Sequence, residues 1–396
     1  MLDNLDSFDA EELKEIDKIV EELSTRNANQ ASRDDLIEFC KRMQPDYKVG
    51  RHHRILADQL MALEDGSKDR VCVNIPPRHG KSQLVSIFYP AWFLGRNPDK
   101  KVMMVSHTTD LAVDFGRKVR NLIGVADYKE IFPDVSLAAD SKSAGRWETN
   151  HGGEYFAAGV GGAITGRGAD LLIIDDPHSE QDALSPKAME SAYEWYTSGP
   201  RQRLQPGGSI IIVQTRWHED DLIGRLTDPT NPHYSPEEAA KWKIINLPAL
   251  AEEDDPLGRE VGELLWPDRF DMEFMEAQRR LDSRGFSALY QGRPTPEDGD
   301  LFRRENVKYY NRKELPKDLR IYAASDHAVG VDKTRNDATC LLIVGVDQND
   351  GIADSRVVAL LQVDSSTERS FSGDDLDLLH RRRRRRKRPV PFTSCA

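Results

Sequence analysis

The chain has 396 residues, with 67 acidic against 55 basic side chains and a formal net charge of −12. This length is enough for two or more domains with a sizeable core. No apolar run approaches the roughly 20 residues needed to span a bilayer, and the acidic, amphipathic start excludes a signal peptide. The four scattered cysteines lack the spacing of a metal site and indicate free thiols in a reducing cytoplasm.

The charge is unevenly distributed along the chain. Eight positive charges stand in the tract Arg381–Arg388, so the other residues hold 47 basic against 67 acidic side chains. A body this acidic does not attract nucleic acid by its overall charge, because the phosphate backbone is itself negative. Any DNA would therefore be held by a local surface or presented by partner proteins.

The start of the chain is expected to be helical. Apolar residues at helical spacing predict helices over residues 8–24 and 52–63. Ser32 with Asp35 three residues later has the pattern of a capping box, which predicts another helix over residues 33–43. We expect these helices to form a lid or a partner-docking element.

After residue 66 the pattern changes to short apolar segments that alternate with helical ones. Strands that are apolar throughout and separated by helices indicate a parallel sheet covered on both faces. The predicted strands cover residues 71–75, 101–106, 154–159, 171–176, 209–215 and 243–248. The predicted fold class is therefore α/β with a mainly parallel sheet, and residues 270–290 predict a further helix.

The segment VCVNIPPRHGKSQLV, residues 71–85, predicts a strand, a tight loop and a helix. Its Gly-Lys-Ser ending is typical of the phosphate-binding loop G-x-x-x-x-G-K-[ST], although Ile75 stands where the first glycine should be. Backbone N–H groups of such a loop point at nucleotide phosphates, a lysine adds positive charge, and a serine hydroxyl binds Mg²⁺. A chance helix start is the alternative. The predicted nucleotide-binding residues are Arg78, His79, Gly80, Lys81 and Ser82, with Ser82 also a metal ligand.

A second motif, LLIIDD at residues 171–176, is typical of a Walker B strand. Asp175, at the end of this buried strand, is predicted to reach the magnesium ion. Asp176 is the predicted general base that polarises the attacking water, and Glu180 is its rival in the loop that follows. A simple strand-end turn is the alternative for this motif alone.

A third motif is the apolar strand SIIIVQT, residues 209–215. Polar residues at the end of a strand beside a phosphate site can sense the γ-phosphate, so Gln214 and Thr215 are predicted coupling residues. The glycine-rich stretch 151–168 permits close approach of a polymer or nucleotide to the backbone, or simply supplies turns.

The second half of the chain predicts a different organisation. The Pro-, Gly- and Asp-rich start of residues 291–318 indicates a linker. Residues 319–364 predict three consecutive strands, and the low-complexity, charged residues 365–396 predict a disordered basic tail. Residues 1–65 are then a helical lead-in and residues 66–290 a P-loop ATPase domain.

Several of these segments together resemble the large terminase subunit of tailed bacteriophages. They are PPRHGKS, SHTTDLAVDFGRKVRNLI, GVGGAITGRGADLLIIDDPHS, RLQPGGSIIIVQTRWHEDDLIGRL and FSALYQGRPTPEDG. The likeness runs from about His52 to at least Asp347. It implies an ATPase of the additional-strand P-loop class, joined to an RNase H-like nuclease, with ATP and Mg²⁺ as cofactors. In the place of the missing loop glycine, Pro76 and Pro77 can supply the curvature.

The resemblance also implies site residues and partners. Gln59, upstream of the P-loop, is the candidate for adenine contact. The trans-acting arginine expected of a ring motor has the candidates Arg78, Arg117, Arg120 and Arg167, which the sequence does not rank. The implied partners are double-stranded DNA, a small terminase subunit, the portal of a procapsid, and further copies in a ring. The implied location is the cytoplasm of the bacterial host.

The nuclease half matches the family less well. An RNase H-like site holds two Mg²⁺ or Mn²⁺ ions between several carboxylates. Asp326 fits the first metal ligand and catalytic residue, whereas Asp337 is expected in a turn. We expect the later ligands to be missing, with the reading frame altered or truncated after about Asp364, and little or no nuclease activity. The Arg381–Arg388 tract is alternatively a true DNA-binding or localisation element.

The predicted function is thus an ATP-driven motor that packages DNA. One alternative is a superfamily 2-type helicase or translocase, which shares the P-loop, the Asp pair and the coupling strand. That class requires a second RecA-like domain after residue 300, where three strands are predicted instead. The other alternative is an inactive prophage remnant.

Overall fold

The computed structural model describes residues 9–66, 69–140, 143–229, 231–294, 319–326, 340–347 and 361–362. The chain divides into two compact units, Met1–Leu301 and Phe302–Ala396. Among the described residues, no helix is both long enough and apolar enough to cross a membrane.

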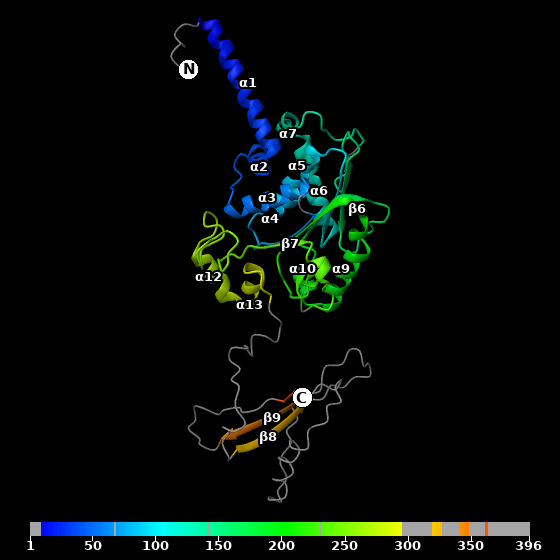
Figure 1. The fold of residues 1–396 in the computed structure, drawn as a ribbon, viewed down its shortest axis with the longest axis vertical. Helices are drawn as coiled ribbons and strands as arrows, with labels where there is room; N and C mark the ends of the chain where they lie inside the picture. Colours follow the sequence, from blue (N-terminus) through cyan, green and yellow to red (C-terminus); the bar gives the residue numbers. More distant parts are fainter. Residues whose placement is uncertain are drawn as a thin grey trace, which may run out of the picture. The chain divides into compact units, whose positions relative to one another are not determined.

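The first unit alternates helices with strands, as predicted (Figure 1). Its strands are β1 (Arg70–Asn74), β2 (Lys101–Ser106), β3 (Arg146–Glu148), β4 (Glu154–Gly159), β5 (Ala169–Asp175), β6 (Leu204–Gln214) and β7 (Trp242–Asn246). Its longer helices are α1 (Ala10–Asp34), α2 (Leu36–Met43), α3 (Arg51–Glu64), α5 (Tyr89–Arg96), α6 (Thr109–Gly124), α9 (Pro186–Ser198) and α12 (Met272–Leu281). Shorter helical segments are α4 (Lys81–Gln83), η2 (Leu84–Phe88), α7 (Ala126–Ile131), α8 (Glu180–Ala183), η3 (Pro200–Arg203), α10 (Leu222–Thr227), α11 (Pro236–Ala239), α13 (Ser283–Gly285) and η4 (Phe286–Tyr290).

In this part of the chain the strands form one sheet of seven, in the order β3-β4-β2-β5-β6-β1-β7. All neighbouring strands pair in parallel except β3, which runs antiparallel to β4 at the edge. The P-loop strand β1 is separated from the Walker B strand β5 by β6. This inserted strand confirms the predicted additional-strand class.

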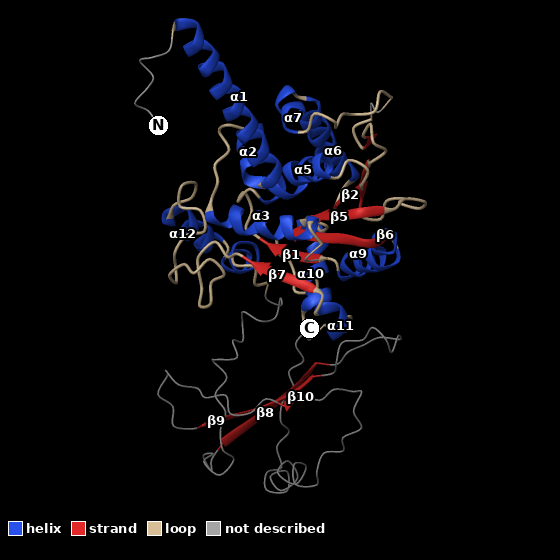
Figure 2. Cartoon of the chain, turned by 45° about the horizontal axis from the view of Figure 1, so that its top comes forward, coloured by secondary structure: helices blue, strands red, loops and turns tan. Residues whose placement is uncertain are grey.

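Helices cover both faces of the sheet, with α5 and α6 on one face and α9 and α10 on the other (Figure 2). Because successive side chains of a strand point to opposite faces, each inner strand contributes to both layers. In β1, Val71 and Val73 join the core under α5 and α6, while Cys72 joins the core under α9. The unbroken apolar strands predicted a sheet of this kind.

The helical lead-in differs from the prediction at one boundary. The first helix does not stop near residue 24 but continues to Asp34, and Ser32 lies inside it, where its hydroxyl donates to the carbonyl oxygen of Ala28. The cap of α2 is Asp35, whose side chain accepts from the N–H groups of Ile37 and Glu38. Ser32 was therefore the wrong cap, because the chain turns three residues later. Side chains of α2 and α3 share one core with the sheet.

The second unit contains β8 (Leu319–Asp326), β9 (Cys340–Asp347) and β10 (Leu361–Gln362) in an antiparallel sheet of order β10-β9-β8. Asp326 ends β8 opposite Cys340, and Asp347 ends β9 opposite Leu319. The predicted third strand is described only at residues 361–362. Most of the predicted linker, the turn residue Asp337, Asp364 and the basic tail lie outside the described residues.

Candidate nucleotide site

The loop after β1 curls back on itself before the next helix. Arg78 and Gly80 both have left-handed backbone conformations, with φ of 63° and 82°. A Cβ atom on Gly80 would lie 2.3 Å from the Nε2 atom of His53. Two features therefore require glycine at position 80. Its backbone angle is unfavourable for other residues, and the side chain of His53 leaves no space for a Cβ atom. The helical turn α4 starts immediately afterwards at Lys81.

Lys81 is almost buried, with 8% of its surface exposed. Its Nζ atom lies 2.8 Å from Oδ2 of Asp176 and donates a hydrogen bond to Oγ1 of Thr215 at 2.7 Å. These three residues come from the P-loop, the end of β5 and the end of β6. Because parallel strands end at the same edge of the sheet, the fold brings all three motifs together.

Asp175 is the most buried carboxylate of this group, with 1% exposed surface. Ser82 donates to its Oδ1 at 3.1 Å, and Ser86, one turn later, donates to its Oδ2. Burial raises the pKa of Asp175 to about 7, and the neighbouring Asp176 raises it too, against the charge of Lys81 and the two hydroxyl donors. Carboxylate and hydroxyl oxygens are ligands that Mg²⁺ prefers. Ser82 and Asp175 therefore fit a magnesium ion.

Asp176 links the ends of three strands. Its carboxylate accepts from the backbone N–H of Thr215 at 2.7 Å, and its own N–H donates to the carbonyl of Val213 at 2.9 Å. Its carbonyl oxygen accepts from the N–H of His107, just after β2. With φ of 44°, it has a conformation that Asp tolerates better than most residues. The rival residue Glu180 is exposed at the first position of α8.

Gln214 belongs to a row of amide side chains across the sheet. Asn74 pairs in register with Gln214 on one side and with Asn246 on the other. Both polar atoms of Gln214, and the Oδ1 atoms of Asn74 and Asn246, are buried without a hydrogen-bond partner among the described residues. Such atoms are costly to bury unless a ligand or water satisfies them. The row lies at the edge of the sheet where Lys81 and Asp175 meet.

A layer of histidine side chains packs against the P-loop, and the sequence analysis did not predict it. The ring Nε2–H of His52 donates to the carbonyl of His79 at 3.0 Å, and Nδ1 of His53 accepts from the N–H of Gly50 at 2.8 Å. Trp266 packs edge-on against the rings of His52 and His53, at 5.2 and 4.8 Å between centroids. Burial lowers the pKa of His52 to about 3, and those of His53 and His79 to about 4, so all three are neutral at pH 7. The adjacent pair His52 and His53 in a predicted helix was the only signal.

The side chain of His79 also points into this layer, where its ring stacks on Phe270 at 4.6 Å. Its backbone remains part of the loop. The prediction that His79 contacts nucleotide therefore concerns its main chain.

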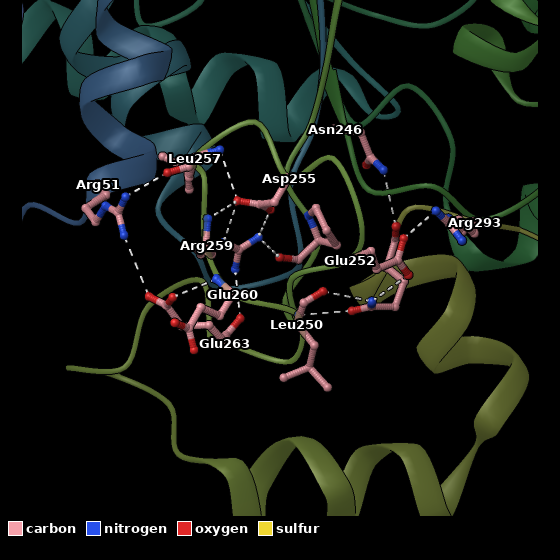
Figure 3. Close-up of polar contacts among 12 residues, drawn as sticks. Arg51, Asn246, Leu250, Glu252, Asp255, Leu257, Arg259, Glu260, Glu263 and Arg293 are labelled. Carbon is pink, nitrogen blue, oxygen red and sulfur yellow. Dashed lines mark hydrogen bonds and ion pairs between the residues drawn. The ribbon is translucent and has the colours of Figure 1, made fainter.

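Trp266 is supplied by a long loop between β7 and α12, which polar contacts hold in place (Figure 3). Asp255 and Arg259 form an ion pair at 2.6 Å, each with 1% of its side chain exposed. Arg259 also donates to the carbonyl oxygens of Pro248 and Glu263. Arg51 of α3 donates to the carbonyl of Leu257 at 2.7 Å. The loop is thus fastened to itself and to the helix that carries the two histidines.

The same loop also contacts the last described residues of the first unit (Figure 3). The side-chain amide of Gln291 accepts from the N–H of Leu250 at 3.1 Å and donates to its carbonyl at 3.0 Å. Arg293 pairs with Glu252 at 2.5 Å, and Asn246, a member of the amide row, donates to the carbonyl of Gln291 at 3.4 Å. The site edge is therefore in contact with the segment that leads to residue 294.

The remaining predicted residues occupy several places. Gln59 lines a cavity of about 300 Å³ between α3 and β7, together with Lys243 and Ile245. Arg167 pairs with Glu154 at 2.7 Å and stacks on Phe156.

The other arginine candidates lie on the surface. Arg117 pairs with Asp114 on α6, Arg120 contacts Asn121, and the side chain of Arg78 is exposed in the P-loop.

Comparison with known proteins gives a consistent result. Residues 72–308 match the family model for the terminase large subunit, T4likevirus-type, N-terminal. The large terminase subunit of Enterobacteria phage T3 is 24% identical over 261 residues, covering 62% of this chain and 44% of that protein. The chain thus spans less than half the length of this relative.

Solved structures give weaker matches. The large terminase of bacteriophage HK97 aligns with a TM-score of 0.40 at 15% identity, over 76% of this chain and 61% of that one. The ATPase domain of the Thermus phage P74-26 large terminase aligns with a TM-score of 0.35 at 18% identity, over 60% and 92%. The large terminase of the thermophilic bacteriophage D6E, in complex with ADP, aligns with a TM-score of 0.33 at 13% identity, over 82% and 73%. The family model covers more than half of the sequence, and the chain therefore belongs to the terminase large subunit family, which it matches in the T4likevirus-type N-terminal region.

Proposed function

We propose that this chain hydrolyses ATP and uses the energy to move double-stranded viral DNA into a procapsid. One observation carries the proposal. The ammonium group of Lys81 lies 2.8 Å from Asp176, one residue from the buried Asp175 that accepts from Ser82. A positive charge, a hydroxyl and two carboxylates that converge after a P-loop are the parts of a magnesium-nucleotide site.

In this proposal the loop binds the phosphates. The N–H groups at the start of α4 would face them, and the ammonium of Lys81 would exchange Asp176 for a phosphate oxygen. That exchange keeps the nearly buried charge of Lys81 paired in both states, which avoids a large desolvation cost. Release of Asp176 frees its carboxylate for a second task.

Ser82 and Asp175 would hold the magnesium ion, which offsets the negative charge of the transferred phosphoryl group when bound. Asp175 must be ionised to do so. Its pKa of about 7 means that metal binding at neutral pH displaces a proton from part of the molecules.

Asp176 is the proposed general base, in preference to Glu180. Its carboxylate lies at the edge where the phosphates would bind, whereas Glu180 is exposed on α8. Thr215 and Gln214 are the proposed coupling residues. Thr215 contacts Lys81 through its hydroxyl and Asp176 through its N–H, so any exchange of partners at Lys81 changes both contacts.

The remaining parts of the proposal rest on family membership. Gln59 is the proposed adenine contact, and Arg78 is the candidate for the arginine acting in trans, because its side chain is exposed within the loop itself. The proposed partners are DNA, a small terminase subunit, a procapsid portal and other copies of the chain in a ring, in the cytoplasm of the host. Metal-dependent DNA cleavage is proposed to be weak or absent.

The test is ATP hydrolysis, with and without double-stranded DNA, by the purified full chain. We expect Lys81→Ala to reduce kcat by at least about a hundredfold, because the charge at the phosphates is lost. Lys118→Ala is the matched control, since Lys118 is half exposed on α6, where it pairs with its neighbour Asp114. A folded wild-type chain without Lys81-dependent hydrolysis would refute the motor and favour an inactive remnant.

A further inference from the structure

Among the described residues, the hydrogen bonds that join the first helix to other elements lie near its C-terminal end. Near its C-terminus, the carbonyl of Ser32 accepts from the indole N–H of Trp92, and that of Arg33 accepts from Arg96. The rest of α1 extends away from the other elements of the first unit (Figure 1). At 1.5 Å per residue, a helix of 25 residues is roughly 37 Å long, so most of it projects beyond the core.

The projecting part carries an apolar stripe. Leu13, Ile16, Ile19, Val20 and Leu23 recur at spacings of three and four residues, which places them on one face of the helix. Leu13, Ile19, Val20 and Leu23 are 37%, 49%, 59% and 51% exposed. We call these five residues the α1 stripe. Lone exposed aliphatic residues are common, but a row of them at helical spacing is typical of a helix that packs against something.

The stripe has acidic borders. At 100° per residue, Asp17 lies along one side of the stripe, and Glu15 and Glu22 lie along the other. Lys14 and Lys18 point to the opposite side of the helix. From Asp9 to Ser24, with both ends included, the chain has seven acidic and two basic residues.

These charges favour one kind of occupant. In a parallel pairing of two copies, Glu12 of one helix would face Asp17 of the other, which is repulsive. An anionic lipid surface is disfavoured for the same reason. An apolar helix face with basic borders satisfies both the stripe and its carboxylates.

We propose that the α1 stripe is a docking surface for an amphipathic helix of another protein, with an apolar face bordered by Lys or Arg. The α1 stripe and its three bordering carboxylates would form a short two-helix seam with this partner. Because the C-terminal end of α1 is bound to α5, the partner would be held next to the first unit. This interaction does not require nucleotide or ATP hydrolysis.

The test uses a labelled helical peptide with leucines at stripe spacing and lysines along both borders, added to the full chain and followed by fluorescence anisotropy. The control peptide has the same leucines and glutamate borders. We expect the lysine peptide to bind at least about tenfold more tightly than the glutamate peptide, and binding to weaken as salt is added.

Three variants locate the interaction. Val20→Asn with Leu23→Asn should weaken binding at least about tenfold, whereas Lys14→Ala with Lys18→Ala, on the far side of the helix, should leave the dissociation constant unchanged. Glu15→Lys, Asp17→Lys and Glu22→Lys together should reverse the preference between the two peptides. Thermal unfolding checks that each variant is folded.

Three results would overturn the proposal. They are equal affinity for both peptides, a wild-type dimer in solution that Val20→Asn with Leu23→Asn dissociates, and stripe-dependent binding to anionic phospholipid vesicles. The second would identify another copy of the chain as the occupant, and the third a membrane surface.

Discussion

Asp175 shows how strongly the fold changes the chemistry of a single residue. Burial raises the pKa of its carboxyl from the usual 3.8 to about 7, so without ligand the folded chain holds a proton there that the unfolded chain releases. Between these two values the folded state binds more protons than the unfolded state. Rising pH in this range therefore lowers the free energy of unfolding, the reverse of the usual behaviour of paired carboxylates.

We expect Asp175→Asn to remove this pH dependence. Without nucleotide, the wild-type free energy of unfolding should fall, relative to that of the variant, by at most about 4 kcal/mol between about pH 4 and pH 7. Urea denaturation of both proteins across this range measures the difference, and all other titrating groups are common to the two. Parallel pH profiles would show that Asp175 titrates normally.

Gly80 is the second residue with a strict requirement. We expect Gly80→Ala to abolish nucleotide binding and to cost at least about 1–2 kcal/mol of stability, because its φ of 82° is unfavourable for alanine and its Cβ would strike His53. Binding of a fluorescent ADP analogue and thermal unfolding measure the two effects.

The double variant Gly80→Ala with His53→Ala separates the causes, since it removes the collision and keeps the backbone strain. It should recover the part of the lost stability that the collision causes, but not the part that the backbone strain causes. The control Gly124→Ala places a Cβ where nothing lies within 4 Å and should be close to neutral. A Gly80→Ala protein with normal binding would contradict the described loop geometry.

At the scale of elements, the loop between β7 and α12 acts as a support for the P-loop. It carries Trp266 against His52 and His53, and the buried Asp255–Arg259 pair holds it closed. A buried ion pair is weak evidence for net stability, but loss of one partner leaves an uncompensated charge. Nucleotide affinity should therefore depend on this ion pair, which supports the P-loop through Trp266.

We expect Asp255→Asn to lower the free energy of unfolding by about 3–5 kcal/mol and to weaken nucleotide binding. The matched control is Glu276→Gln, since Glu276 pairs with Arg280 on the surface of α12 with more than half of each side chain exposed. That change should cost only a few tenths of a kcal/mol. Equal losses in both variants would show that the Asp255–Arg259 pair does not hold the loop.

At the scale of the whole molecule, the described strands of the second unit fix the positions of two of its carboxylates. In the second unit, Asp326 and Asp347 end the neighbouring antiparallel strands β8 and β9, at opposite ends of the strand pair. The seven steps between them, at about 3.3 Å each, separate their backbones by roughly 23 Å. Two metal ions for phosphoryl chemistry lie only about 3.5–4 Å apart, so these two residues do not share such a site.

The expectation of little or no nuclease activity predicts that the purified chain leaves supercoiled plasmid uncut in Mg²⁺ or Mn²⁺. Asp326→Ala should leave ATP hydrolysis unchanged, because Asp326 belongs to the other unit. Linearisation by the wild type that Asp326→Ala lacks would establish a working nuclease and refute this expectation. Gel electrophoresis of the plasmid is sufficient for the measurement.

The fold could be predicted well where local pattern and tertiary packing agree. The six longer strands of the first unit were recognised because each contains a short apolar run, which is continuous in the buried central strands. β3 was missed because three residues at a sheet edge have no periodicity to detect. Ser32 was mistaken for a helix cap because Asp35, three residues on, has an equally suitable side chain.

Part of the site could also be predicted from the apolar strands. Lys81, Asp175, Asp176 and Thr215 each follow an apolar strand, and parallel strands necessarily present their carboxyl ends at one edge. Ser86 gave no signal of its own, because its contact with Asp175 joins residues 89 positions apart. The same holds for Trp266 beneath the histidines.

By itself, the sequence determined the class of sheet, the order of its motifs and the family, since these depend on short apolar runs and on residues adjacent in the chain. Only the tertiary structure decided which side chains surround the site. Three features arise from residues distant in sequence. They are the raised pKa of Asp175, the lack of space for a Cβ atom at position 80, and the packing of Trp266 against the histidines. Their contacts depend on how helices and loops pack over the sheet, which no local pattern encodes.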